Sequence, residues 1–404
     1  WEPVRRLVCL LPGACVPPAT FRALLLRHLD ELPTSCAALS SPEARERGRG
    51  LLAFLVAGWH ASGDAAPAPL ALGTLFTEVS ALLKRTPQLG LTDLVLYNWR
   101  VDAQTKLSYN GDAGGPADVV EQGQEHDHQA RLGISCMPKV QPSQRFLCVE
   151  EEDWFCRLHV TLASGMGGVV RAINHCAFAK SVTEQVRSLQ LLEHAIEALV
   201  KVHYAAGIGQ PLSRTDVPNI RPALLMQRLH RFLPHAPELE IGPTELRATR
   251  VYCATGIDQA CMMHVLGVAK GAHAIARFRE WQLRDLPTAH REYLEKVLGG
   301  VSIREQVERE VGMRKLSVQQ LAHLELAHNS CIDMLLRLST RRWELVCSMF
   351  GEETLKKDWE QERQLISEAR LKLLIERRAM AQPTDRNSSH HGGTSLPLAD
   401  NSSP

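Results

Sequence analysis

Arg342 lies on the apolar side of a predicted helix, where a permanently charged side chain needs a partner. In the stretch LLRLSTRRWELVCSMF, residues 335–350, helical spacing places Leu335, Leu338, Val346 and Met349 on one side, with Arg342 in the middle. A guanidinium only donates hydrogen bonds, and burying it unpaired costs on the order of several kcal/mol. The pattern predicts that Arg342 has a partner in the core, and a guanidinium could bind an anion there bidentately. A rotated helix that leaves Arg342 in solvent is the alternative.

Other residue patterns in the chain give weaker indications of chemistry. The sequence contains neither GxSxG nor HExxH, and GMGG at 165–168 is not a phosphate-binding loop. This glycine run favours close packing of a helix against a neighbour or a flat ligand. The run EHDH at 125–128 could supply ligands to a metal ion, but a polar loop offers too few further ligands to complete a site. Helical histidines such as His264 and His328 are interpreted as satisfied core or boundary residues.

Composition is that of an ordinary globular protein without a dominant charge. The 46 basic and 45 acidic residues nearly cancel, so no nucleic-acid partner is expected. Eleven cysteines show no CxxC pair and favour a reducing, cytoplasmic location. The start, WEPVRRLVCLLPGACVPPA, is similar to a signal peptide, although Pro12 and Gly13 interrupt its apolar run. No apolar run reaches the roughly 18 residues of a membrane span, so no membrane partner is expected.

The elements that must position these residues are helices, because alternating strand patterns are nearly absent. The predicted fold class is all-α, with a large helical domain and a smaller N-terminal helical domain. The predicted organisation follows chain order: a small helical domain at 1–108, a polar loop or insertion at 109–150, a large all-α domain with a ligand pocket at 151–350, a charged helix at 351–380 and a disordered tail at 381–404.

Several segments in the same order resemble the indoleamine 2,3-dioxygenase family. ARFREWQLRDLPTAHREYLEK matches a family segment through Phe278, Pro287, His290 and Arg291. LTDLVLYNWRVDAQTKLSYNGD is similar to the end of the family's small domain, and AHNSCIDMLLRLSTRRWELV aligns without a gap on its last large helix. The resemblance covers roughly residues 45–350. It implies haem b between the helices of the large domain and insertion of dioxygen into the indole ring of tryptophan, in the kynurenine pathway.

The resemblance also assigns positions to the pocket. Trp154 and Phe155 correspond to two phenylalanines over the distal face of the haem, and Leu158 to a serine. The arginine that pairs with the substrate carboxylate falls near His230, beside Arg228 and Arg231. A small loop lining the pocket is matched loosely around Thr255 and Gly256.

Two positions depart from the family pattern. Arg342 stands where the family has the histidine that binds the haem iron, and Ser339 where it has an arginine beside a haem propionate. Arginine has no available lone pair for iron, so no metal ligand is expected at Arg342. The first interpretation is a haem dioxygenase acting on tryptophan or a related indole. The alternative is a catalytically impaired relative that binds haem weakly, or binds another anion through Arg342.

A third interpretation concerns the charged helix at 352–380, which extends beyond the resemblance. It could bind a protein partner, or it could be a solvated helix that packs through an apolar seam. That seam consists of Leu355, Trp359, Ile366 and Leu373.

Overall fold

The computed structural model describes most of the chain, in separate ranges. These are residues 1–14, 19–62, 67–94, 96–101, 140–205, 228–233, 256–269, 271, 274–312, 316–350 and 356–372. The described residues are predominantly helical, which confirms the all-α class. The only described strands are β1 (Trp99–Val101) and β2 (Val140–Pro142), which pair antiparallel with Arg100 opposite Gln141.

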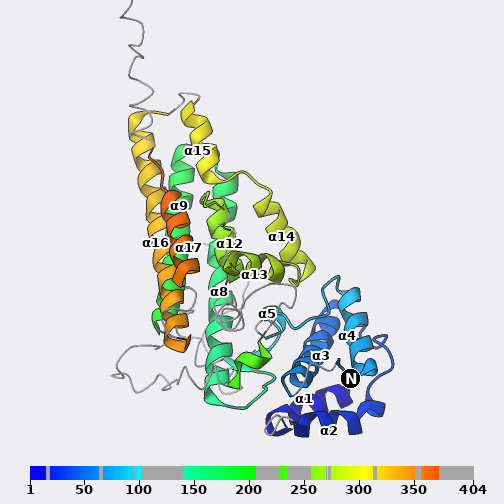
Figure 1. Cartoon of the computed structure of the whole chain (residues 1–404). Helices are drawn as coiled ribbons and strands as arrows, with labels where there is room; N and C mark the ends of the chain where they lie inside the picture. The colour runs from blue at the N-terminus through cyan, green and yellow to red at the C-terminus, as the bar shows by residue number, and fades with distance from the viewer. Residues whose placement is uncertain are drawn as a thin grey trace, which may run out of the picture.

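The N-terminal helices form a small lobe, at the lower right of Figure 1. Its elements are α1 (Glu2–Ala14), α2 (Ala19–Arg27), η1 (Leu29–Glu31), α3 (Pro42–Ala61), α4 (Leu70–Leu82) and α5 (Leu91–Leu94). Helix α3 begins where Ser41 Oγ accepts a hydrogen bond from Ala44 N, 3.1 Å away, with Pro42 in the first turn. Phe54, Leu52 and Leu55 of α3 are buried at the centre of this lobe.

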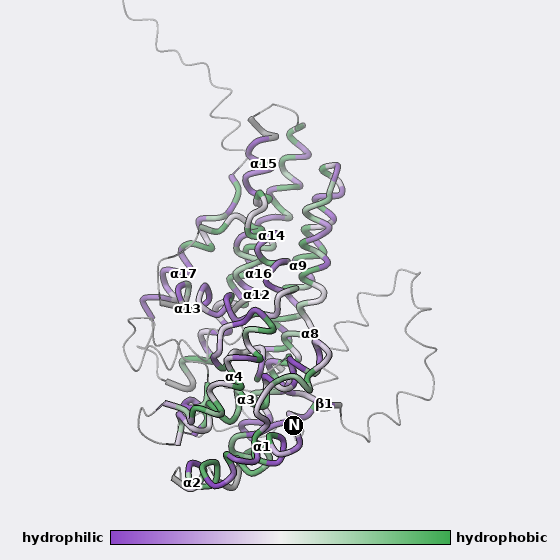
Figure 2. Tube along the Cα trace, turned by 90° about the vertical axis from the view of Figure 1, so that its right-hand side faces the viewer, coloured by the Kyte–Doolittle hydropathy of each residue, from purple (hydrophilic) through white to green (hydrophobic). Residues whose placement is uncertain are grey.

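The large lobe is built around three long helices that lie side by side, α8 (Glu150–Phe178), α9 (Val182–Ala205) and α16 (Val318–Phe350) (Figure 1). The other elements are η3 (His230–Phe232), α12 (Gly256–Val265), α13 (Ala274–Leu283), α14 (Thr288–Leu298), α15 (Ile303–Gly312) and α17 (Lys356–Glu368). Figure 2 shows hydrophobic and hydrophilic residues mixed along these helices, as amphipathic packing requires. None of the described helices is long and apolar enough to cross a bilayer.

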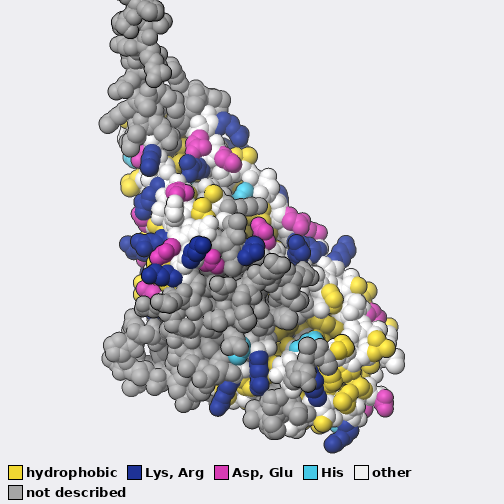
Figure 3. Space-filling model, in the orientation of Figure 1, with side chains coloured by type: hydrophobic (Ala, Val, Ile, Leu, Met, Phe, Trp, Pro, Cys, Tyr) yellow, Lys and Arg dark blue, Asp and Glu magenta, His cyan; other side chains and the backbone are white. Residues whose placement is uncertain are grey.

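Charged side chains of both signs are interspersed on the upper part of the large lobe in Figure 3. Eight cysteines lie among the described residues, and five of them are buried: Cys36, Cys156, Cys176, Cys261 and Cys331. Burial raises the pKa of Cys176 to about 12, so this thiol stays protonated and packs as a small apolar group.

A column of stacked aromatic rings connects the two lobes. Phe146, just before α8, stacks on Phe54 of α3 at 4.4 Å and on Phe232 of η3 at 4.3 Å between ring centroids. The predicted insertion at 109–150 therefore ends in a structured segment, since 140–149 contributes β2 and a core phenylalanine. The rest of that insertion up to 139, and the predicted tail at 381–404, lie outside the described residues.

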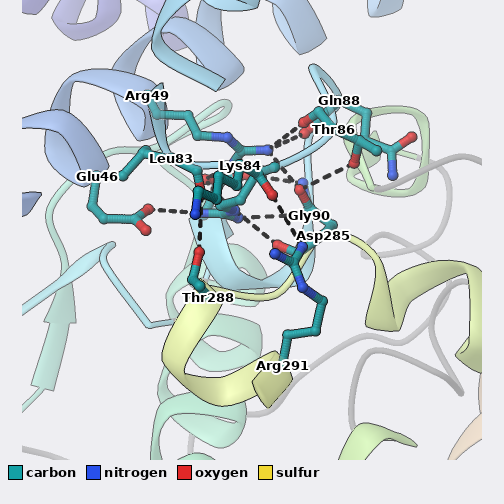
Figure 4. Close-up of polar contacts among 12 residues, drawn as sticks. Glu46, Arg49, Leu83, Lys84, Thr86, Gln88, Gly90, Asp285, Thr288 and Arg291 are labelled. Atoms are coloured by element: carbon teal, nitrogen blue, oxygen red, sulfur yellow. Dashed lines mark hydrogen bonds and ion pairs between the residues drawn. The ribbon is translucent and has the colours of Figure 1, made fainter. Parts of the chain in front are cut away.

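A buried ionic network also joins the lobes (Figure 4). Asp285, between α13 and α14, contacts Arg49 Nη2 of α3 at 2.6 Å and Arg85 Nη2, just after α4, at 3.2 Å. Arg49 also pairs with Asp93 of α5, and Arg85 Nη1 lies 2.5 Å from Glu46 Oε2. Three carboxyl groups thus share two guanidinium groups in a region closed to solvent.

Candidate functional site

Helix α16 carries Arg342 and Ser339 on its buried side. The helix starts with a capping box, in which Ser317 Oγ accepts from Gln320 N at 3.2 Å and Gln320 Oε1 accepts from Ser317 N at 2.8 Å. Its buried residues include Leu335, Leu338 and Val346, as the spacing predicts. Arg342 is buried on this face with 2% exposure, so the rotated-helix alternative is wrong.

Two guanidinium groups meet at one amide oxygen of Gln259, on α12. Arg342 Nη1 donates to Gln259 Oε1 at 2.6 Å, and Arg279 Nη2 of α13 donates to the same oxygen at 3.1 Å. All three side chains are buried. Like charges so close in a medium of low dielectric constant repel each other, so the arrangement is stabilised by an anion nearby.

Glu362 of α17 supplies a carboxylate to this cluster. Its Oε1 accepts hydrogen bonds from Gln259 Nε2 at 2.6 Å and from Ser339 Oγ at 2.7 Å, and its Oε2 lies 3.1 Å from Arg279 Nη2. Glu362 has no solvent exposure. We call Gln259, Arg279, Ser339, Arg342 and Glu362 the polar cluster. It brings together four helices, α12, α13, α16 and α17.

Two buried histidines lie within the range of the electrostatic effect of Arg342. His159 of α8 donates from Nδ1 to the backbone oxygen of Phe155 at 2.7 Å, which leaves Nε2 with its lone pair. The buried Nε2 atoms of His159 and of His203, on α9, have no hydrogen-bond partner among the described residues. Burial, with a smaller contribution from Arg342, lowers the pKa of His159 to about 4 and that of His203 well below its usual value. Both imidazoles are therefore neutral at pH 7.

The aromatic residues expected near this region are all buried on α8. Trp154 and Phe155 are each 2% exposed, and Leu158 is fully buried. The Phe155 ring lies against His159, with 4.1 Å between ring centroids. Helix α8 thus presents these side chains to the core from its first three turns.

The residues expected to bind a substrate carboxylate lie on a different segment, before and within η3. Arg228 is exposed. The 3-10 helix η3, which contains His230 and Arg231, packs against α3, and its Phe232 stacks on Phe146. The members of the polar cluster come instead from α12, α13, α16 and α17. Thr255 lies outside the described residues, and Gly256 is the first residue of α12.

Metal-ligand groups are absent from the described part of the chain, where no three His, Cys, Asp or Glu residues are arranged to hold an ion. The EHDH run lies outside it. His328 is a core histidine as expected, but only half satisfied: its Nε2 lies 3.0 Å from the backbone oxygen of Leu266, whereas its buried Nδ1 has no hydrogen-bond partner among the described residues.

The positions that the resemblance assigns to haem do not fit that group. A guanidinium has no lone pair for iron, and Arg342 already donates to Gln259. The position of the family's propionate arginine holds Ser339, whose hydroxyl donates a hydrogen bond to Glu362. The side chain at this position is therefore already bonded to a carboxylate of the chain itself, that of Glu362, and not to a haem propionate.

The fold and the polar cluster define a class: a two-lobed, all-α protein with a buried cluster of two arginines, a glutamate and two neutral polar residues between the helices of its large lobe. The chain matches no family model and no curated protein.

Proposed function

We propose that this chain is a divergent relative of the indoleamine 2,3-dioxygenase family that binds an anionic ligand at the polar cluster and does not oxidise tryptophan. The observation that supports the proposal is the convergence of Arg342 and Arg279 on Gln259 Oε1. Two guanidinium groups held this way are suited to carboxylate or phosphate oxygens, which they bind with directed, charge-assisted hydrogen bonds. They offer no lone pair to a metal.

The test compares haem with metal-free protoporphyrin, which carries the same two propionates but no iron. If carboxylates are recognised, the two compounds should bind the wild-type chain with dissociation constants within about threefold. Arg342→His supplies an imidazole, and should shift the preference toward haem by about tenfold or more. Arg337→His, an exposed position on the same helix, is the matched control and should leave both affinities unchanged. Visible spectra and equilibrium titrations provide the measurements.

The haem dioxygenase activity of the family is the second candidate, and His159 favours it. The lone pair of its buried Nε2 is of the type that binds iron, and its Nδ1–H is already fixed by a carbonyl oxygen. Formation of N-formylkynurenine from tryptophan by the wild-type chain, lost in His159→Ala, would replace the first proposal with this one.

A further inference from the structure

Helix α17 is attached to the large lobe by a buried carboxylate as well as by apolar side chains. Within its bounds, the buried side chains are Glu362 and Ile366. Trp359 of α17 stacks on Trp343 of α16, with 5.6 Å between ring centroids and 12° between ring planes. Burying a charge is costly unless hydrogen bonds compensate for it, and a leucine would anchor a structural helix at lower cost. A carboxylate at this point therefore indicates a site with a preference for carboxylates.

The groups around Glu362 form such a site without the help of α17 itself. Gln259 Nε2, Ser339 Oγ and Arg279 Nη2 approach the two carboxylate oxygens from three different helices, at 2.6, 2.7 and 3.1 Å. We propose that Gln259, Ser339 and Arg279 form a binding site for a small carboxylate, filled here by Glu362, and that a carboxylate ligand displaces Glu362 and releases the start of α17. The inference rests on the proposed anion binding and names its ligand class and its regulation.

The far end of the helix has separate attachments that can act as a hinge. Asn329 and Leu371 bind reciprocally, with Asn329 Nδ2 donating to the Leu371 oxygen at 3.1 Å and Leu371 N donating to Asn329 Oδ1 at 2.9 Å. Arg304 Nη1 donates to the backbone oxygen of Glu368 at 3.1 Å. Loss of the Glu362 contacts would therefore free residues 356–366 first, while the segment around Leu371 stays in place.

The experiment uses benzoate as the probe and benzamide as its uncharged analogue, with the full chain. In Glu362→Ala the internal carboxylate is gone, so benzoate should bind at least about tenfold more tightly than to the wild type. Benzamide should bind neither protein measurably. Glu360→Ala, an exposed residue on the same helix, loses the same charge and should behave as the wild type.

Hydrogen exchange tests the release of the helix. Saturating benzoate should speed amide exchange in residues 356–366 of the wild type and abolish the contribution of the Trp343–Trp359 pair to fluorescence. Glu362→Gln, which keeps an acceptor oxygen but loses the charge facing Arg279, should show faster exchange without ligand and covers the case in which Glu362→Ala fails to fold. Equal benzoate affinity in the wild type and the Glu362 variants, or binding without faster exchange, would overturn the inference. Neither result depends on the porphyrin comparison, so the two proposals fail separately.

Discussion

At the scale of single residues, the buried carboxyl group of Asp285 is fixed in position by the groups around it. Asp285 is held by Arg49 and Arg85, so its carboxylate cannot move away from the backbone that approaches it. The backbone in question is that of Gly90, where an added Cβ atom would overlap Asp285 Oδ2. A glycine is required here because of close approach and not because of an unusual backbone angle.

Gly90→Ala should therefore lower the free energy of unfolding by about 3 kcal/mol, since the new methyl group separates Asp285 from its guanidinium partners. Urea unfolding measures the change. Gly73→Ala is the control, because a Cβ there meets nothing within 4 Å and lies within α4. That substitution should stabilise the protein by about 0.5–1 kcal/mol. A loss of the same size in both variants would show that Gly90 is not a close-approach site.

Two of the five members of the polar cluster, Arg342 and Ser339, were singled out from the sequence, and the other three were missed. Arg342 was predictable because leucines and valines at helical spacing define its face. The same signal exists for Glu362, which lies between Trp359 and Ile366 on the apolar side of α17. Gln259 and Arg279 gave no such signal, because neutral amides and arginines are common at helix boundaries. Their partners are 83 and 20 positions away along the chain, and a single sequence does not reveal such pairings.

At the scale of elements, the start of α8 is tied to the segment before it by a buried carboxylate. Glu152 accepts from three consecutive backbone N–H groups, those of Phe146 at 2.6 Å, Leu147 at 2.8 Å and Cys148 at 3.1 Å. Burial raises the pKa of Glu152 to about 7, although these three bonds oppose the rise. The contacts fix the direction in which the chain enters α8 and thus place Trp154.

Glu152→Ala should lower the free energy of unfolding by about 3 kcal/mol, because it leaves buried backbone donors without acceptors. Glu152→Gln keeps one acceptor oxygen and should cost about 1 kcal/mol. Glu150→Ala, an exposed residue of the same turn, is the control with a change near zero. Chemical unfolding followed by circular dichroism provides the measurement, and equal losses in the alanine variants at 150 and 152 would contradict the assignment.

Helix positions were more predictable than the contacts between helices. The stretch at 335–350, predicted to be helical, lies within α16, and Ile366 is buried in the apolar seam as predicted. Trp359, also predicted in the seam, stacks on Trp343 of α16. The remaining two predicted seam residues, Leu355 and Leu373, lie outside the described residues. Hydrophobic periodicity reports which side of a helix is buried, whereas the partner that covers it depends on the whole fold.

At the scale of the whole molecule, the ionic network and the phenylalanine column hold the two lobes together. The two-domain division was predicted from composition and helix patterns, but Arg49 and Asp285 are 236 residues apart and could not be paired from one sequence. Three carboxyl groups share two guanidinium groups, so one proton makes the network neutral. Burial and the charge of Asp93 raise the pKa of Asp285 to about 7, while Arg49 and Arg85 hold the pKa of Asp93 below its usual value against the effect of burial.

The raised pKa of Asp285 predicts how the stability of the lobe junction depends on pH. Between about pH 4 and 7 the folded state holds a proton on Asp285 that the unfolded state has released, so this contribution to stability is lost as pH rises toward 7. For the wild type, the loss from this group between pH 5 and 7 should be about 2 kcal/mol. Asp285→Asn removes the titration, so its free energy of unfolding should fall less than that of the wild type between pH 5 and 8.

Asp93→Asn is the matched comparison for this prediction. It removes the carboxylate that stays ionised beside both guanidinium groups, and should destabilise the protein by about 3–5 kcal/mol at either pH. Urea unfolding of the three proteins at pH 5 and pH 8 separates the two roles. If Asp285→Asn showed the same fall with pH as the wild type, the shared proton would have to reside elsewhere in the network, with Glu46 the next group, because burial raises its pKa as well.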